Sequence, residues 1–169
     1  KSLGNFILVH DIIKEINPNV LRFFMISVHY RNPINYNREL VDAARAGLER
    51  IQDSYRQAKE RLDSAVGTEV DNKITEIIQE NVKTFEAHMD DDFNTANAIS
   101  AWHDITSELN KYLRYNTTNA EVLTEFIEVF EKYAGVLGIV LEEDTILLDE
   151  EVEKLIEERN DARKNKDFS

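Results

Sequence analysis

Apolar residues recur along most of the chain at the three- and four-residue spacing that is typical of amphipathic helices. The longest stripe predicts a helix from residue 38 to about residue 65, with its apolar side at positions 40, 44, 48, 51, 55, 58, 62 and 65. Further helices of similar length are predicted over about 71–90, from about 95 to 113, and from about 120 to Gly138, which suits the end of a helix. Four such helices predict an antiparallel four-helix bundle.

The chain before this bundle predicts two short helices. The first covers residues 10–16 and ends at Asn17, because a residue that precedes proline is sterically kept out of the helical conformation. Pro18 suits the first turn of the second helix, which reaches about Val28 and is apolar on nearly all sides. Residues 29–37 have no helical period, so we expect an extended connection whose final asparagine caps the long helix.

A further helix is predicted after the bundle. Residues 139–148 form a connection, and Asp149 can cap a highly charged helix over about 150–166. The predicted fold class is therefore all-α. The chain divides into three parts: a short two-helix region over 1–37, the helical bundle over 38–148, and a trailing charged helix over 149–169.

The composition excludes several classes of protein. The 169 residues contain no Cys, which excludes disulfide scaffolds, thiolate zinc sites and cysteine nucleophiles within them. Mean hydropathy is −0.46 and no apolar run approaches about eighteen residues, so no membrane-spanning helix is predicted. The first residue is Lys rather than Met and no secretory segment follows, which indicates a piece of a longer cytoplasmic protein.

Charge is distributed unevenly along the chain. The net charge of −13 disfavours a nucleic-acid partner, because phosphate binding needs a basic surface. Residues 1–65, however, contain ten Lys and Arg against eight Asp and Glu, whereas residues 66–169 contain ten against twenty-five. A basic surface for RNA can therefore be built from the first part, while the acidic remainder is expected to be solvated helix surface.

Patterns for catalysis or metal binding are missing from the sequence. The four histidines form no HExxH motif, and there is neither a Walker loop nor a GxSxG elbow. The aspartates at 90–92 lack the spacing and the glycine of a calcium loop, so we expect them to end one helix and start the next. Tyr30 and Tyr36, in the extended connection, are better candidates for a contact surface. We predict no catalytic residue and no metal site in this chain.

Five short sequence segments nevertheless occur in an order that is informative about the family. They are KSLGN at 1–5, NVLRFF at 19–24, HYRNPI at 29–34, MDDDFNTA at 89–96 and ERNDARKNKDF at 158–168. The first resembles the end of the KMSKS loop of class I aminoacyl-tRNA synthetases. In this order the strings resemble the cysteinyl-tRNA synthetase family, and the likeness covers essentially the whole chain.

The resemblance implies a function for a longer parent protein. Such a parent activates cysteine with ATP, transfers it to tRNA(Cys), and holds zinc through residues that this sequence does not contain. The resemblance identifies residues 1–37 with the end of the KMSKS loop and a stem-contact region, residues 38–148 with a DALR-type tRNA-binding bundle, and residues 149–169 with the first helix of an anticodon-recognition region. Lys1, with its neighbour Ser2, matches the ATP-binding lysine of the loop, and an ammonium there stabilises developing phosphate charge. Alone, these residues are expected to be inactive in adenylation.

The same resemblance implies that the bundle contacts the backbone of tRNA. Our candidates are Arg31, Arg38, Arg45 and Arg56, which lie in the connection and on the less acidic first long helix. The alternative is that these arginines form helix ion pairs with neighbours such as Glu49, Asp53 and Glu60. Besides tRNA(Cys), the expected partner is the catalytic domain of the same longer protein, and we expect a monomer without membrane contact.

Two other functions compete with this interpretation. A related cysteine ligase that acts on an amino-sugar is disfavoured, because the string at 158–168 resembles the tRNA-recognising end of the family. A stand-alone acidic helical bundle that binds another protein would have no affinity for RNA. The Lys at the first position and the half-motif at 1–5 count against it.

Overall fold

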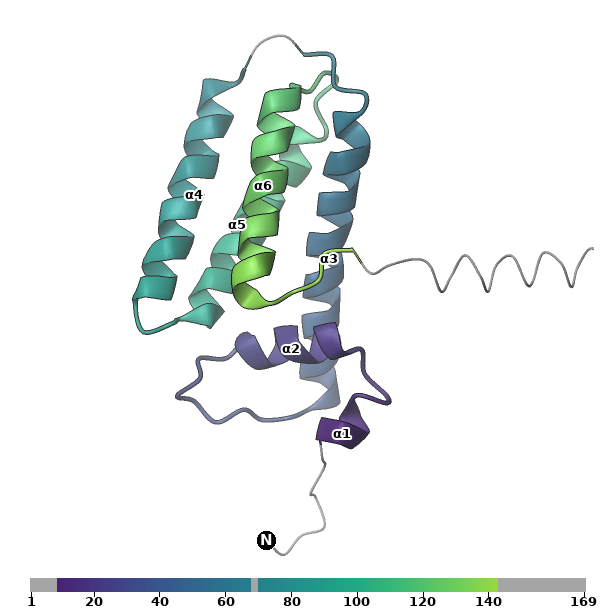
Figure 1. The fold of residues 1–169 in the computed structure, drawn as a ribbon, viewed down its shortest axis with the longest axis vertical. Coiled ribbons are helices and arrows are strands. Elements are labelled where there is room, and N and C mark those ends of the chain that lie inside the picture. Colours follow the sequence, from purple (N-terminus) through teal and green to yellow (C-terminus); the bar gives the residue numbers. More distant parts are fainter. Residues whose placement is uncertain (1–8, 68–69, 143–169) are drawn as a thin grey trace, which may run out of the picture.

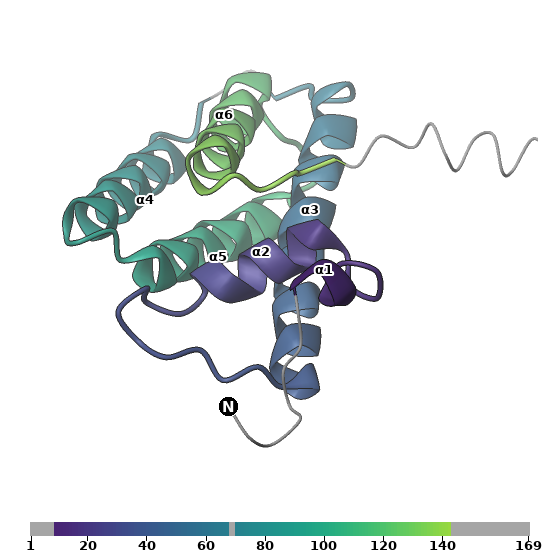
Figure 2. The same cartoon turned by 60° about the horizontal axis from the view of Figure 1, so that its bottom comes forward.

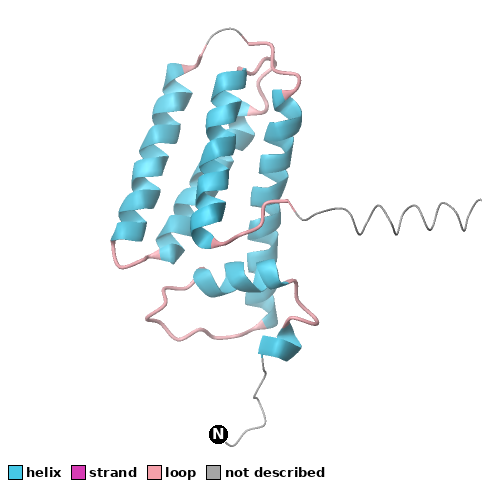
Figure 3. Ribbon diagram, in the orientation of Figure 1, coloured by secondary structure: helices cyan, strands magenta, loops and turns pink. Residues whose placement is uncertain are grey.

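The computed structural model describes residues 9–67 and 70–142, and helices are the regular elements within these ranges (Figures 1 and 3). An isolated bridge between Gly67 and Asn119 is the nearest approach to a strand in this part of the chain. The six helices are α1 (Val9–Ile12), α2 (Pro18–Ile26), α3 (Arg38–Leu62), α4 (Asn72–Asp90), α5 (Thr95–Tyr112) and α6 (Ala120–Leu137). The all-α prediction is confirmed, while the trailing helix predicted for 149–169 lies outside the described residues.

Helices α3 to α6 form the predicted bundle and alternate in direction along the chain (Figure 1). Helix α3 packs against α5 and α6, and α4 packs against the same two helices. Helices α3 and α4 therefore occupy opposite corners of the bundle, although they are consecutive in the sequence, as Figure 2 shows. Helix α2 lies across the end of the bundle at which α3 begins and packs on α3.

Each long helix begins at a polar residue whose side chain accepts hydrogen bonds from the first backbone N–H groups. These caps are Asn37, Asp71, Asn94 and Asn119. Such caps satisfy donors that the helix itself leaves unpaired. Helix α6 ends at Gly138 in the left-handed conformation, with φ of +67°, as the sequence predicts.

The core of the bundle is aromatic. The indole of Trp102 is fully buried, and the rings of Phe130 and Tyr133 meet it edge-on with centroids 6.0 Å away. Tyr133 also stacks on Phe85 at 3.7 Å between centroids. Nε1 of Trp102 has no hydrogen-bond partner in the described part of the chain.

The N-terminal segment, residues 9–37, is attached to the bundle through α2. Phe23 and Phe24 of this helix are buried. The side chain of Asn19 forms two hydrogen bonds with the backbone of Val140, donating to its oxygen at 2.8 Å and accepting from its nitrogen at 3.0 Å. The two ends of the described chain are thereby joined beside α3.

Several helices end earlier than the sequence predicts. Helix α1 ends at Ile12 instead of residue 16, α2 ends at Ile26, and α3 ends at Leu62. The predicted apolar stripe was also wrong at its first position, because Leu40 is 48% exposed whereas Val41 is 1% exposed. Val41 precedes the buried Leu48 by seven residues, which is almost two full turns, while a spacing of eight rotates the side chain away.

Candidate functional site

Three of the four predicted arginines lie on one side of α3. Arg38, Arg45 and Arg56 are separated by seven and eleven residues, close to whole numbers of helical turns. Arg38 and Arg56 are exposed and Arg45 is half-buried. Arg56 pairs with Asp53 at 3.2 Å, so the helix ion pair considered as the alternative is present there. Neither Arg38 nor Arg45 forms an ion pair with another described residue.

Arg38 and Arg45 share a small cavity at the junction between α3 and the N-terminal segment. The cavity has a volume of about 210 Å³, and Glu15, Tyr36 and Asp42 also line it. Two acidic and two basic residues therefore line the same space, and neither arginine forms an ion pair with either acidic residue. The cavity presents mixed charge, and an anion there would meet attraction and repulsion together.

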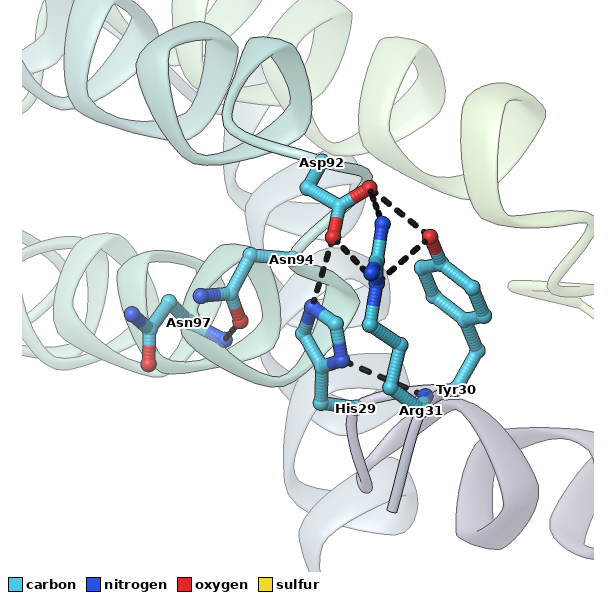
Figure 4. Close-up of polar contacts among 6 residues, drawn as sticks. All are labelled: His29, Tyr30, Arg31, Asp92, Asn94 and Asn97. Atoms are coloured by element: carbon cyan, nitrogen blue, oxygen red, sulfur yellow. Dashed lines mark hydrogen bonds and ion pairs between the residues drawn. The ribbon is translucent and has the colours of Figure 1, made fainter.

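Arg31 is placed elsewhere, in a polar cluster with His29, Tyr30 and Asp92 (Figure 4). Its Nε and Nη2 atoms contact the two carboxylate oxygens of Asp92 at 2.7 and 3.0 Å, and Nε donates to the Tyr30 hydroxyl at 3.0 Å. The Tyr30 hydroxyl in turn donates to Asp92 at 2.7 Å, and the His29 ring stacks on that of Tyr30. The cluster joins the connection before α3 to the turn between α4 and α5.

The turn that presents Asp92 has an unusual backbone. Asp92 and Phe93 have φ angles of +56° and +52°, a conformation that non-glycine residues rarely adopt. Backbone bonds to the end of α4 hold the turn, because Phe93 donates to Met89 and Asn94 donates to His88. The side chain of Phe93 is consequently 69% exposed. The prediction that the aspartates at 90–92 end one helix is confirmed by Asp90, but Asn94 caps the next, and the ion pair of Asp92 was missed.

The contacts in the cluster shift the pKa values of its two charged members. Hydrogen bonds from Arg31, and then from Tyr30, hold the pKa of Asp92 below its usual range. The same contacts with Asp92 raise the pKa of Arg31. Because Asp92 already occupies the guanidinium of Arg31, this arginine is less available to an external anion than Arg38 or Arg45. Sequence offers no signal for the pair, since 61 residues separate its members.

Lys1 and Ser2, the predicted ATP-binding residues, lie outside the described residues. Within the described ranges, no three or more side chains of His, Asp and Glu gather in a way that could hold a metal ion. No helix in these ranges is both long and apolar enough to cross a membrane.

Comparison with known proteins finds similarity to tRNA synthetases. The family described as the class I (C) tRNA synthetase catalytic domain matches residues 1–46, and the DALR domain family matches residues 84–142. Proteins named cysteine–tRNA ligase from Staphylococcus haemolyticus and Staphylococcus epidermidis are 57% and 58% identical over the whole of this chain. A protein of the same name from Staphylococcus aureus is also 58% identical. The chain spans 37% of the length of each of these relatives.

Proposed function

Over its whole length the chain is a homologue of the cysteine–tRNA ligases, and on this premise we propose that it docks tRNA(Cys) for an enzyme that joins cysteine to this tRNA with ATP. The observation that carries the proposal is the identity of 57–58% across the full chain. The match to a class I catalytic domain over 1–46 and the match to a DALR domain over 84–142 support it.

The proposed division of labour follows the chain. Residues 1–37 form the end of the catalytic signature loop and a stem-contact region, residues 38–148 form the tRNA-binding bundle, and residues 149–169 begin an anticodon-recognition region. The join at α2, where Asn19 binds Val140, supports a fixed orientation between the first two parts. Such an orientation is what a rigid tRNA needs from a protein that contacts it at several places.

The contact with tRNA is proposed to run along α3. Arg38, Arg45 and Arg56 lie on one side of this helix and reach over about 27 Å, from the rise of 1.5 Å per residue. Contacts from arginine to phosphate fix the register of an RNA without reading its sequence. Arg31 is the weakest of the four candidates, because Asp92 already neutralises it.

ATP binding is proposed for Lys1 and Ser2 within the longer enzyme, and Lys1→Ala in that enzyme should slow adenylate formation. A zinc ion, where the enzyme uses one, is proposed to bind residues that this sequence does not contain, because the chain has no Cys. The protein is proposed to be cytoplasmic and monomeric. The chain alone is expected to bind tRNA without forming cysteinyl-adenylate.

The test is the binding of labelled tRNA(Cys) to this chain over a range of salt concentrations, with a non-cognate tRNA for comparison. The triple variant Arg38→Gln/Arg45→Gln/Arg56→Gln should bind less tightly. Its slope of log K against log salt should fall by about one for each phosphate that the variant no longer binds.

A matched control removes three positive charges from other helices. Lys73 and Lys83 belong to α4 and Lys132 to α6. The variant Lys73→Gln/Lys83→Gln/Lys132→Gln should keep the slope of the unmodified chain. If both triple variants lost the same affinity and salt slope, a specific role of the three arginines would be refuted. If the unmodified chain bound no tRNA at any salt concentration, docking by these residues would be refuted.

A further inference from the structure

A second basic surface lies between α3 and α5, and its α3 residues are turned by about 100–140° around the helix from Arg38, Arg45 and Arg56. It is a groove of about 480 Å³ whose charged lining residues are Arg50, Lys111 and Arg114. The polar side chains of Gln57, Ser107 and Asn110 line it as well, and no carboxylate does. This lining is unusual in a protein whose net charge is −13.

The two arginines of this groove are unneutralised. Neither Arg50 nor Arg114 forms an ion pair with another described residue. Arg50 donates from Nη2 to the Ser107 hydroxyl at 2.9 Å, and this hydroxyl donates to the backbone oxygen of His103. The guanidinium is therefore positioned over α5 by a neutral partner and keeps its full charge. Lys111 differs, because it pairs with Glu108 at 2.7 Å.

Beside the groove, polar side chains of α3 and α5 already satisfy one another. Ser54, which is 2% exposed, donates to the backbone oxygen of Arg50 and pairs with the side-chain amide of Asn110. These bonds hold α3 and α5 together and leave the side chains of Gln57 and Arg114 free to contact a ligand in the groove. Burial first, and then the charge of Arg50, lowers the pKa of His103 on α5, while Asp104 raises it.

The dimensions of the groove favour an extended anion. Arg50 and Gln57 are seven residues apart on α3, so the polar rim runs for about 10 Å along this helix. On the other side of the groove, Ser107 lies on α5 and Arg114 in the turn that follows α5. A small free anion is usually held by donors that converge on one point, as in a nest of backbone N–H groups. Separated cations along a surface groove suit successive groups of a nucleic-acid backbone instead.

We propose that the groove between α3 and α5 binds the ribose-phosphate backbone of an RNA strand, with Arg50 and Arg114 on phosphates and Gln57 beside a ribose hydroxyl. The proposal deepens the tRNA docking proposed above and rests on it. It adds a second contact surface, next to the one on α3 that the sequence predicts. RNA is recognised in this way through phosphate and 2′-hydroxyl groups, and positioning on the backbone needs no base contact.

The first test measures tRNA(Cys) binding by the variant Arg50→Gln/Arg114→Gln. Its slope of log K against log salt should fall by about two relative to the unmodified chain. The variant Lys73→Gln/Lys83→Gln removes the same charge from α4 and should keep the slope. Both substitutions are on the surface, and circular dichroism checks that each variant keeps its helices. An unchanged slope in the arginine variant, alongside binding by the unmodified chain, overturns the groove and leaves the docking function standing.

The second test uses the lack of Cys in the sequence. A benzophenone attached to the Gln57→Cys variant should cross-link to bound tRNA(Cys), while the same label on Glu128→Cys, an exposed position of α6, should not. Equal cross-linking at both positions overturns the groove. No binding of tRNA by the unmodified chain overturns the docking function itself. Phosphate or pyrophosphate that binds the chain with an affinity equal to that of tRNA overturns the RNA assignment in favour of a free-anion site.

Discussion

The bundle and the N-terminal segment differ in the interactions that stabilise each of them. The bundle encloses a continuous core in which the large side chains of Phe85, Trp102 and Phe126 are fully buried. The N-terminal segment contributes one helix face, and polar contacts between residues far apart in the sequence add to it, among them Asn19 with Val140 and Arg31 with Asp92. Burial of apolar surface is the dominant stabilising term in folding, whereas exposed ion pairs contribute little. The comparison teaches that the bundle supplies the stability and the N-terminal segment is oriented on it.

The largest expected effect comes from emptying the core of either region. Phe126→Ala should destabilise the bundle by about 3–5 kcal/mol, as other large-to-small core substitutions do. Phe23→Ala should instead loosen α2, so that its amides exchange faster while those of α5 and α6 stay protected. Denaturant unfolding and hydrogen exchange measure the two effects. If Phe23→Ala lowered protection equally in all helices, the two regions would be one cooperative unit and the comparison would be wrong.

A smaller effect is expected at Gly138, where the two regions meet. Its φ is +67°, and an added Cβ would lie 2.8 Å from Nη1 of Arg22 on α2. Gly138→Ala should therefore destabilise the protein by about 1 kcal/mol from the backbone alone, because the Arg22 side chain can move aside.

Gly135 provides the matched control for this substitution. It is helical, and an added Cβ would meet nothing within 4 Å. Gly135→Ala should stabilise the protein by up to about 1 kcal/mol, since Ala is the better helix former. Thermal unfolding of both variants measures the two changes in stability. If Gly135→Ala lost as much stability as Gly138→Ala, the explanation from the backbone conformation of Gly138 would be refuted.

The smallest effect is expected in the Arg31–Asp92 cluster. Because the pKa of Asp92 is lower in the folded protein than its ordinary value of 3.8, the ion pair is fully formed above that value and disappears as the pH falls through the lowered pKa. The side-chain carbon signal of Asp92 should follow this titration by NMR. Arg31→Gln should raise the pKa toward 3.8, and Tyr30→Phe should raise it less. A larger rise with Tyr30→Phe would contradict the order of the two contacts.

Much of the fold could be predicted because its signals are local. The period of apolar residues located the four long helices, and Asn37 and Gly138 were predictable as caps from their chemistry alone. The one-residue error at Leu40 arose because spacings of seven and eight both look helical until a buried neighbour fixes the phase.

The candidate site was less accessible to prediction, because its partners are distant in the sequence. Arg38, Arg45 and Arg56 share a side of α3 by helical spacing, which the sequence contains. The ion pair between Arg31 and Asp92 depends on which helices become neighbours. The same is true of the groove in which Arg50 and Arg114 stay without an acidic partner among the described residues. The positive φ angles of Asp92 and Phe93 could not be predicted, because neither residue is a glycine.

The position of Trp102 has a spectroscopic consequence. It is the one tryptophan of the 169 residues, and it lies at 0% exposure between Phe130 and Tyr133. Its fluorescence therefore reports on the interior of the bundle and on nothing at the surface. An RNA bound along α3 should leave the emission maximum in place, whereas unfolding of the bundle should shift it toward longer wavelengths as the indole meets water. The protein carries an intrinsic probe that separates loss of structure from occupation by a ligand.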